Sequence, residues 1–177
     1  MRIITGKYKG RHFEVPRSFK ARPTTDFAKE NIFNVLRAYL DFEETAALDL
    51  FGGTGSISLE LVSRGCPRVV TVEKDRQHFS FIAQCCKVLA DDAWTPLCAD
   101  ALRFIARGGE AYGLIFADPP YALPELPELP ERVMNSRLVK EGSLFVLEHG
   151  KTNDFSNRPD FVEHRAYGSV NFSIFRK

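Results

Sequence analysis

The chain has 177 residues, of which 44% are hydrophobic and 27% charged, and its net charge is +1 at pH 7. This length permits one domain with a substantial core, and the composition is typical of a soluble globular protein. No apolar run approaches membrane-spanning length, and Met1–Thr5 is too short and too quickly charged for a signal sequence. We therefore expect a cytoplasmic protein that does not enter a membrane.

The four cysteines form neither a metal-binding nor a disulfide pattern. Cys66, Cys85, Cys86 and Cys98 include no C-x-x-C pair and have no histidines at zinc-ligand spacing. We expect reduced thiols that mostly fill the core, and no bound metal. The adjacent Cys85 and Cys86 leave a redox switch as the alternative.

Positive charge is concentrated at the amino terminus. Residues 1–30 hold eight Lys or Arg against three acids and so carry +5, whereas the other 147 residues carry −4. A basic arm on a weakly acidic body favours a polyanionic partner. The alternative is that these basic residues lie on an ordinary solvent-exposed surface and bind no partner.

A short β-hairpin is predicted at the start of the chain. Arg2–Thr5 and His12–Val15 flank a turn that is rich in glycine, cations and one tyrosine. Such a tip can contact RNA phosphates through cations and stack a base on the aromatic ring. Its candidate RNA-contact residues are Lys7, Tyr8, Lys9 and Arg11. A loosely held terminus is the alternative.

The next segment signals the start of a helix. Residues 22–26, Arg-Pro-Thr-Thr-Asp, precede apolar residues at helical spacing from Ala28 to Tyr39. This pattern predicts a helix that packs one face on the core and leaves Lys29 and Arg37 off that face. Residues 1–22 are therefore read as a basic extension and 23–177 as the main domain.

Residues 46–50 read as the first strand of a sheet, followed by a glycine turn and a helix to about Arg64. Glycines let the backbone approach a ligand, and the helix start offers free N–H groups. Asp49 would repel a pyrophosphate but can pair, directly or through water, with an amino group. The third glycine of the dinucleotide fingerprint is absent. A nicotinamide-dependent oxidoreductase is therefore the least favoured enzyme.

Two more strand-helix units follow. In the first unit, a strand at residues 68–72 ends at Glu73 and a helix covers 76–90. In the second, a strand at 94–98 ends at Asp100-Ala101 and a helix runs to about Arg107. In doubly wound folds an acid at the position of Glu73 holds ribose hydroxyls. Asp100-Ala101 is placed to meet an adenine edge.

The fourth strand ends in the most informative motif, Asp118-Pro119-Pro120-Tyr121. Four apolar residues precede it, and the prolines stop the strand and stiffen the loop. Asp118 and the Pro119 carbonyl can each accept an N–H from an exocyclic amine, while Tyr121 stacks on the base. An ordinary carboxylate is a weak base, so Asp118 is assigned to orientation and charge stabilisation before proton removal. With Asp49, Glu73 and Asp100, it predicts a ligand crevice at one sheet edge.

The remaining segments complete the sheet. A Leu-Pro-Glu triplet repeated three times after Tyr121 suits polyproline II or a stiff, interrupted lead into a helix that ends near Arg137. The repeat is interpreted as a rim beside the target pocket, with a plain spacer as the alternative. Residues 142–148 form a fifth strand. Residues 161–167 and 170–175 then form a closing antiparallel hairpin.

With these residues in place, the chain resembles the class I S-adenosylmethionine-dependent methyltransferases, and closely the RsmD family, which methylates a guanine N2 in small-subunit ribosomal RNA. The resemblance runs nearly end to end and is strongest in residues 2–6 with 10–11, 22–26 with Glu30 and 33–34, 49–55, and 118–121. It implies a Rossmann-like α/β fold with a mostly parallel sheet of about seven strands, a C-terminal antiparallel hairpin and an N-terminal β-hairpin extension. The Leu-Pro-Glu repeat departs from the family pattern.

The resemblance also implies roles for particular residues. The donor S-adenosylmethionine would be held by Asp49, Phe51, Gly53, Thr54, Gly55, Glu73, Asp100 and Ala101. The target base would be held by Asp118, Pro119 and Tyr121, and RNA by Lys7, Tyr8, Lys9, Arg11, Arg22 and Thr24.

The sequence therefore predicts methylation of a guanine N2 in 16S ribosomal RNA, within an assembling particle, by a monomer. Methylation of adenine N6 in DNA or RNA is the rival enzyme reading, although a large target-recognition domain is missing. A protein-glutamine methyltransferase is disfavoured because that family carries Asn where Asp118 stands. A catalytically silent RNA-binding assembly factor with the same fold is the alternative of a different class.

Overall fold

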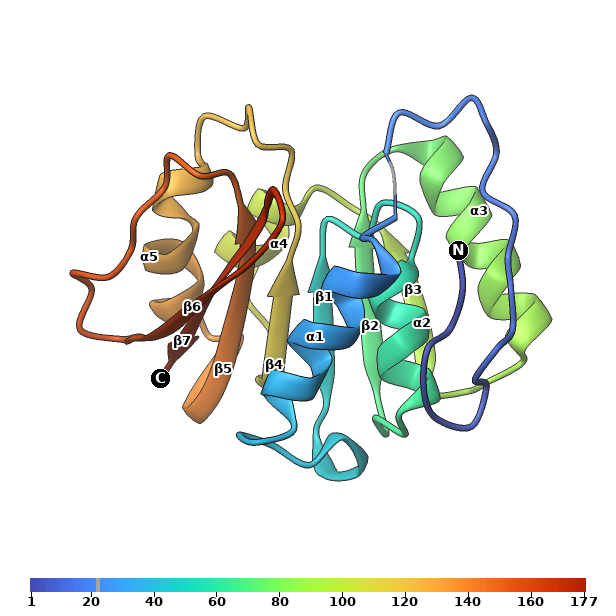
Figure 1. The fold of residues 1–177 in the computed structure, drawn as a ribbon, viewed down its shortest axis with the longest axis horizontal. Helices are drawn as coiled ribbons and strands as arrows, with labels where there is room; N and C mark the ends of the chain where they lie inside the picture. The colour runs from blue at the N-terminus through green and yellow to red at the C-terminus, as the bar shows by residue number, and fades with distance from the viewer. Residues whose placement is uncertain (22) are drawn as a thin grey trace.

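The computed structural model describes residues 1–21 and 23–177, so Arg22 lies outside the described residues. Within them a single sheet has the order β3-β2-β1-β4-β5-β7-β6 (Figure 1). The strands are β1 (Ala47–Leu50), β2 (Val69–Glu73), β3 (Trp94–Cys98), β4 (Tyr112–Ala117), β5 (Val139–His149), β6 (Phe161–Tyr167) and β7 (Val170–Arg176).

Strand β7 runs against the rest of the sheet. The neighbours from β3 to β5 are all parallel, and β7 pairs antiparallel with both β5 and β6. The predicted α/β class, the strand number and the closing hairpin are confirmed. The carboxyl ends of the five parallel strands β1 to β5 consequently share one edge of the sheet.

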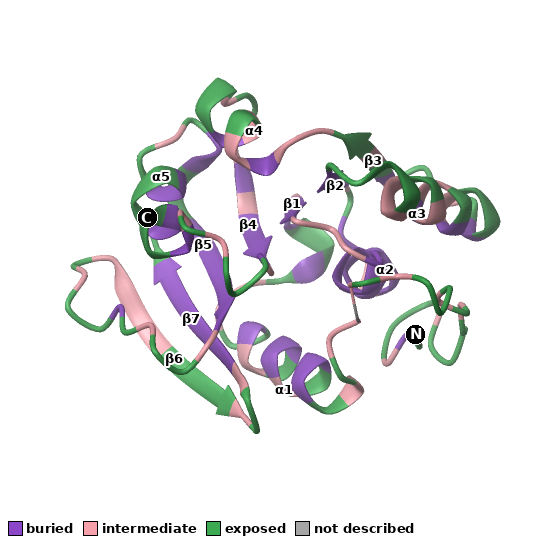
Figure 2. Ribbon diagram, turned by 90° about the horizontal axis from the view of Figure 1, so that it is seen from above, coloured by how far each residue is buried: buried purple, intermediate pink, exposed green. Residues whose placement is uncertain are grey.

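Among the described residues, five α-helices cover the two faces of the sheet (Figure 2). They are α1 (Asp26–Leu36), α2 (Ser56–Ser63), α3 (Arg76–Leu89), α4 (Ala101–Arg107) and α5 (Leu129–Met134), with short 3₁₀ turns η1 (Phe42–Glu44) and η2 (Leu126–Glu128). Side-chain oxygens of Thr25, Asp75 and Asp100 accept backbone N–H groups at the starts of α1, α3 and α4. No helix in the described part of the chain is both long enough and apolar enough to cross a membrane.

The alternation of strand side chains produces two cores. Ala47, Val69, Leu114 and Phe116 belong to the core with α1, α2 and α3. Residues of the same strands that point to the opposite face, including Leu48 and Ile115, belong to the core with α4 and α5. Both faces are apolar because a parallel sheet is covered on both sides.

The predicted short amino-terminal β-hairpin is present but extends over fewer residues than expected: an antiparallel bridge joins Arg2 and His12, and the Ile3 and Phe13 N–H groups donate to the Arg11 and Met1 carbonyls at 3.0 and 2.9 Å. Helix α2 supplies the partners that a second strand would have provided. Glu60 accepts the backbone N–H groups of residues 4 and 5 at 2.9 and 3.0 Å, and the Ser63 carbonyl accepts that of Lys7 at 2.8 Å. With those donors satisfied by a helix, no longer ladder forms.

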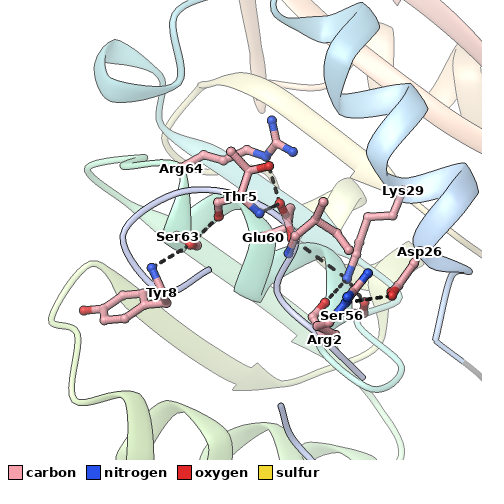
Figure 3. Close-up of polar contacts among 10 residues, drawn as sticks. Arg2, Thr5, Tyr8, Asp26, Lys29, Ser56, Glu60, Ser63 and Arg64 are labelled. Carbon is pink, nitrogen blue, oxygen red and sulfur yellow. Dashed lines mark hydrogen bonds and ion pairs between the residues drawn. The ribbon is translucent and has the colours of Figure 1, made fainter. Parts of the chain in front are cut away.

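Lys29 corrects a second expectation, because only 1% of it is exposed. Its Nζ donates to the Arg2 carbonyl at 2.6 Å and to Ser56 Oγ at 3.0 Å, and lies 3.9 Å from Glu60 (Figure 3). Burial lowers the pKa of Lys29, and the Glu60 carboxylate opposes that shift. The lysine thus joins α1, α2 and the amino-terminal segment.

The Leu-Pro-Glu repeat is helical rather than polyproline II. Its later triplets form η2 and the first turn of α5, with Leu126 and Leu129 buried. Proline is tolerated there because the first turn of a helix does not need its N–H. Of the two readings from the sequence, the stiff lead into a helix is the correct one.

Candidate active site

Four acids from four strands lie at the carboxyl edge of the sheet. Asp49 pairs in register with Thr71 on β2, Glu73 is the last residue of β2, and Asp100 and Asp118 closely follow β3 and β4. Ala117 pairs with Leu50, so Asp118 leaves the sheet next to the glycine turn. The structure thus brings together the acids that the sequence placed at strand ends.

The glycine turn between β1 and α2 is tightly wound. Phe51, Gly53 and Gly55 have positive φ values of 60°, 57° and 80°. Gly52 donates to the Val72 carbonyl at 2.8 Å and accepts from the Gly55 N–H at 2.7 Å. A Cβ on Gly52 would lie 2.4 Å from Thr71 Cγ2. No side chain fits at that position without displacing its neighbours.

The turn carries no side chain at Gly53. A Cβ built there would lie 3.8 Å from Ala21 Cβ and from the Phe51 carbonyl oxygen, which is ordinary van der Waals contact, and without that Cβ a ligand can come closer to the backbone. Thr54 is buried and Phe51 is half-buried. The first residues of α2 follow immediately; the N–H groups at a helix start have no partner within the helix, and Asp49 accepts that of Ser58.

Glu73 holds the turn to the end of β2. Its Oε2 accepts the Gly53 N–H at 2.7 Å, and its Oε1 accepts the Asp75 N–H at 2.7 Å. Each carboxylate oxygen has a second lone pair. Glu73 can therefore accept hydroxyl donors of a ribose while it fixes the turn.

Asp49 is only 1% exposed and lies beneath the turn. Its Oδ2 accepts the Ser58 hydroxyl at 2.6 Å, and Ser58 also contacts Thr71, which accepts from Trp94 Nε1 at 2.8 Å. Burial raises the pKa of Asp49 to about 7, and the Ser58 hydrogen bonds oppose the rise. The charge of this carboxylate therefore changes close to neutral pH.

Asp100 and Ala101 start helix α4. Asp100 Oδ1 caps the helix by accepting the Arg103 N–H at 3.0 Å, and its Oδ2 has no hydrogen bond to the described residues. Ala101 is buried. The open oxygen and the small neighbour suit an amino group on a flat ring.

Beside the Asp-Pro-Pro-Tyr loop lies an acid that sequence reasoning missed, Glu148 of β5. Tyr121 Oη donates to Glu148 Oε1 at 2.9 Å, and the side chains of Glu148 and Asp118 lie within hydrogen-bonding reach of each other. Burial raises the pKa of Asp118 well above its ordinary value, and Glu148 and Asp49 add to the rise. The position of Glu148 at the end of a strand beside β4 was the only available signal.

Tyr121 presents a face for a flat ligand. It is 49% exposed although its hydroxyl is bound, and its ring lies against Gly150, where a Cβ would be 3.6 Å from Tyr121 Cδ2. Pro119 beside it is buried. The ring is thus held from one side and open to solvent on the other.

The candidate RNA-contact residues of the amino-terminal turn lie away from this edge. Lys7 Nζ and Tyr8 Oη both bind Asp91, which precedes β3, at 2.6 and 2.8 Å. Lys7 Nζ lies 5.2 Å and Arg11 Cζ 5.8 Å from the centre of the Tyr8 ring, and Lys9 and Arg11 are exposed. The structure does not bring these four residues to the crevice.

Thr24 lies near the crevice, where its hydroxyl lowers the pKa of Glu148. Arg22, the remaining candidate for RNA contact, falls outside the described residues. In the part of the chain that the structure describes, no three His, Cys, Asp or Glu side chains form a group able to hold a metal ion.

The residues present fit S-adenosylmethionine. Gly53 has no side chain to block a ligand, Glu73 offers acceptors for a ribose, Asp100 offers one for an adenine amino group, and Asp49 can balance an ammonium group. This chemistry, together with the strand order and the Asp-Pro-Pro-Tyr loop, defines a class I methyltransferase.

The chain belongs to the family described as Conserved hypothetical protein 95, whose model matches residues 1–176. The resemblance seen in the sequence is thereby confirmed. YlbH of Bacillus subtilis (strain 168) is 30% identical over 100% of this chain and 99% of its own length. Ribosomal RNA small subunit methyltransferase D of Escherichia coli (strain K12) is 27% identical over 100% of this chain and 90% of its own length.

Solved structures agree with this assignment. The yhhF protein of Escherichia coli superposes with a TM-score of 0.88 at 25% identity, covering 100% of this chain and 97% of that chain. A hypothetical protein of Thermus thermophilus superposes with a TM-score of 0.87 at 29% identity, covering 100% and 99%. The likeness therefore includes the amino-terminal segment as well as the sheet.

Proposed function

We propose that this protein is an S-adenosylmethionine-dependent methyltransferase that modifies a guanine N2 in small-subunit ribosomal RNA. The observation that carries the proposal is the placement of Asp118 beside the glycine turn, on adjacent parallel strands. The name of the Escherichia coli relative, which spans the whole chain, supports ribosomal RNA as the substrate.

The chain's own residues would act mainly by placement. S-adenosylmethionine supplies an electrophilic methyl group on a sulfonium. Asp118 and the Pro119 carbonyl would accept the two N–H groups of the exocyclic amine, which turns the nitrogen lone pair toward the donor site. Tyr121 would stack on the base, which has to leave its own stack to reach this loop. Asp49, Glu73 and Asp100 would hold the donor, with Phe51, Gly53, Thr54, Gly55 and Ala101.

The basic segment at residues 1–22 would contact RNA away from the reacting base. Lys9 and Arg11 are exposed, and the turn that carries them is bound to Ser63 at the carboxyl end of α2. A folded RNA or ribosomal particle is large enough to touch both this turn and the crevice, and phosphates bind such cations without sequence preference. We extend the proposal to a particle substrate and to a monomeric enzyme in the cytoplasm.

The test combines methyl transfer with nucleoside analysis. Purified protein, labelled S-adenosylmethionine and unmethylated small-subunit ribosomal RNA, free or in particles, should yield N2-methylguanosine by mass spectrometry. Asp118→Ala should lose at least about a hundredfold in turnover, with donor binding by calorimetry unchanged. Asp92→Ala, an exposed acid, is the matched control.

Each rival reading predicts a different result. N6-methyladenosine as the product would replace guanine with adenine as the target. No binding of S-adenosylmethionine at millimolar concentration would favour a silent RNA-binding factor. Near-normal turnover by Asp118→Ala would remove Asp118 from its assigned place.

A further inference from the structure

Glu148 is the residue of the crevice for which no role has been assigned. Ala117 on β4 pairs with Leu147 on β5, so Asp118 and Glu148 lie side by side at the edge of the sheet. Only 6% of Glu148 is exposed, and its Oε2 is buried without a hydrogen bond from the described residues. A buried carboxylate oxygen with no donor is costly, and a proton shared with a second carboxyl group removes that cost.

We propose that Glu148 is a positioning residue that makes Asp118 a general base: the two carboxylates together take up the proton that the amine loses on methylation. The inference rests on the proposed function, because it needs an amine bound at Asp118. It changes the assignment drawn from the sequence, in which Asp118 only orients the amine and stabilises charge.

The proton transfer balances as follows. The amine nitrogen forms its bond to the methyl carbon with its lone pair and becomes positively charged. One N–H bond then breaks, its electron pair returns to nitrogen, and the proton forms an O–H bond on Asp118. That proton lies between Asp118 and Glu148 and passes to solvent after the products leave.

The electrostatics of the pair match this task. Burial and the neighbouring charges of Glu148 and Asp49 raise the pKa of Asp118, and burial raises the pKa of Glu148. Because the two groups are in contact, the titration belongs to the pair. A carboxylate whose pKa is raised toward the working pH accepts a proton far better than an ordinary one.

The groups around Glu148 keep the pair in place. Tyr121 donates to its Oε1, and Thr24 and Asp118 also lower its pKa. On the other side, Phe172 of β7 stands opposite Glu148 and carries no charge. Among the described residues with a resolved influence on this pair, none is a cation.

The experiment is a pH profile of single-turnover methyl transfer from labelled S-adenosylmethionine to unmethylated small-subunit ribosomal particles. In the wild type the rate should rise with pH to a plateau. In Glu148→Gln the inflection should move at least about one pH unit lower, and the plateau should fall about tenfold because a weaker base remains. Glu141→Gln, an exposed acid on the same strand, should reproduce the wild-type profile.

Two further measurements keep the proposal open to refutation if Glu148→Gln folds poorly. Glu148→Asp should give an inflection between those of the wild type and Glu148→Gln. Because Asp49 also titrates near neutral pH, the infrared measurement is made on Asp49→Asn, which should show the band of a protonated carboxyl group near neutral pH, whereas the double variant Asp49→Asn with Asp118→Asn should lack it. An inflection at the same pH in the wild type and Glu148→Gln, or no such band in Asp49→Asn, overturns the proposal.

The failures of the two proposals can be told apart. Methylation of another amine with the shifted profile would refute the guanine assignment and leave the carboxylate pair standing. N2-methylguanosine formed with an unshifted profile would refute the pair alone.

Discussion

Asp49 offers the sharpest test of how burial tunes this site. The carboxyl group is enclosed beneath the glycine turn and bonded to Ser58, and its pKa is raised to about 7. In Asp49→Asn the Ser58 hydroxyl can still donate to an oxygen, but the side chain no longer ionises. The substitution therefore isolates the free-energy cost of the buried charge.

The magnitude follows from the two pKa values. The folded pKa of about 7 lies above the ordinary 3.8, so the folded state binds more protons between these values and stability falls as pH rises through that window. Above pH 7 the full cost is about 4 kcal/mol, and at pH 5 it is about 2 kcal/mol. The gap in unfolding free energy between Asp49→Asn and the wild type should thus grow by about 2–3 kcal/mol from pH 5 to pH 8.

Urea denaturation at pH 5 and pH 8 measures this gap directly, with Asp92→Asn as an exposed control that should follow the wild type. Calorimetry adds a second readout. Binding of the cationic donor to wild-type protein at pH 7 should release about half a proton, because the ligand favours the ionised carboxylate. A gap that stays constant between the two pH values would refute the reasoning for Asp49.

Two further predictions concern the turn and the amino-terminal segment. Gly52→Ala should lower the melting temperature and weaken donor binding at least about tenfold, because there is no room for its Cβ. Gly109→Ala, whose Cβ would have no atom within 4 Å, should change neither quantity. Thermal melts measure the first effect and calorimetry the second. Glu60→Ala should cost about 3 kcal/mol in urea unfolding because Lys29 stays buried without its carboxylate, and hydrogen exchange should show the backbone amides that Glu60 holds becoming exposed. Unchanged hydrogen exchange at these amides in Glu60→Ala, or an equal loss of unfolding free energy in the exposed control Glu44→Ala, would contradict the prediction for Glu60.

Local patterns in the sequence were enough to predict the main sheet. The apolar runs that end at Glu73 and Asp118, and the glycines after Asp49, follow rules that depend only on neighbouring residues. The placement of these acids at one edge then followed from the parallel arrangement of strand-helix-strand units. The structure agrees with each of these steps.

Long-range partners decided what the sequence did not predict. Lys29 looked like a surface cation because its acid, Glu60, lies 31 positions later and on another helix. The predicted hairpin is likewise shorter than expected, because Glu60 and Ser63 of α2 accept the backbone N–H groups of residues 4, 5 and 7. Glu148 went unnoticed as a partner of Asp118 since no local motif marks it.

Because the amino-terminal segment depends on α2, the two must fold in a fixed order during synthesis. Residues 1–13 leave the ribosome before Glu60 and Ser63, which bind their backbone and emerge some fifty residues afterwards. The leading segment therefore cannot settle until the first strand-helix unit exists, and Ile3 then closes that side of the core. A segment that is synthesised early thus takes its place only with a helix that is made about fifty residues later.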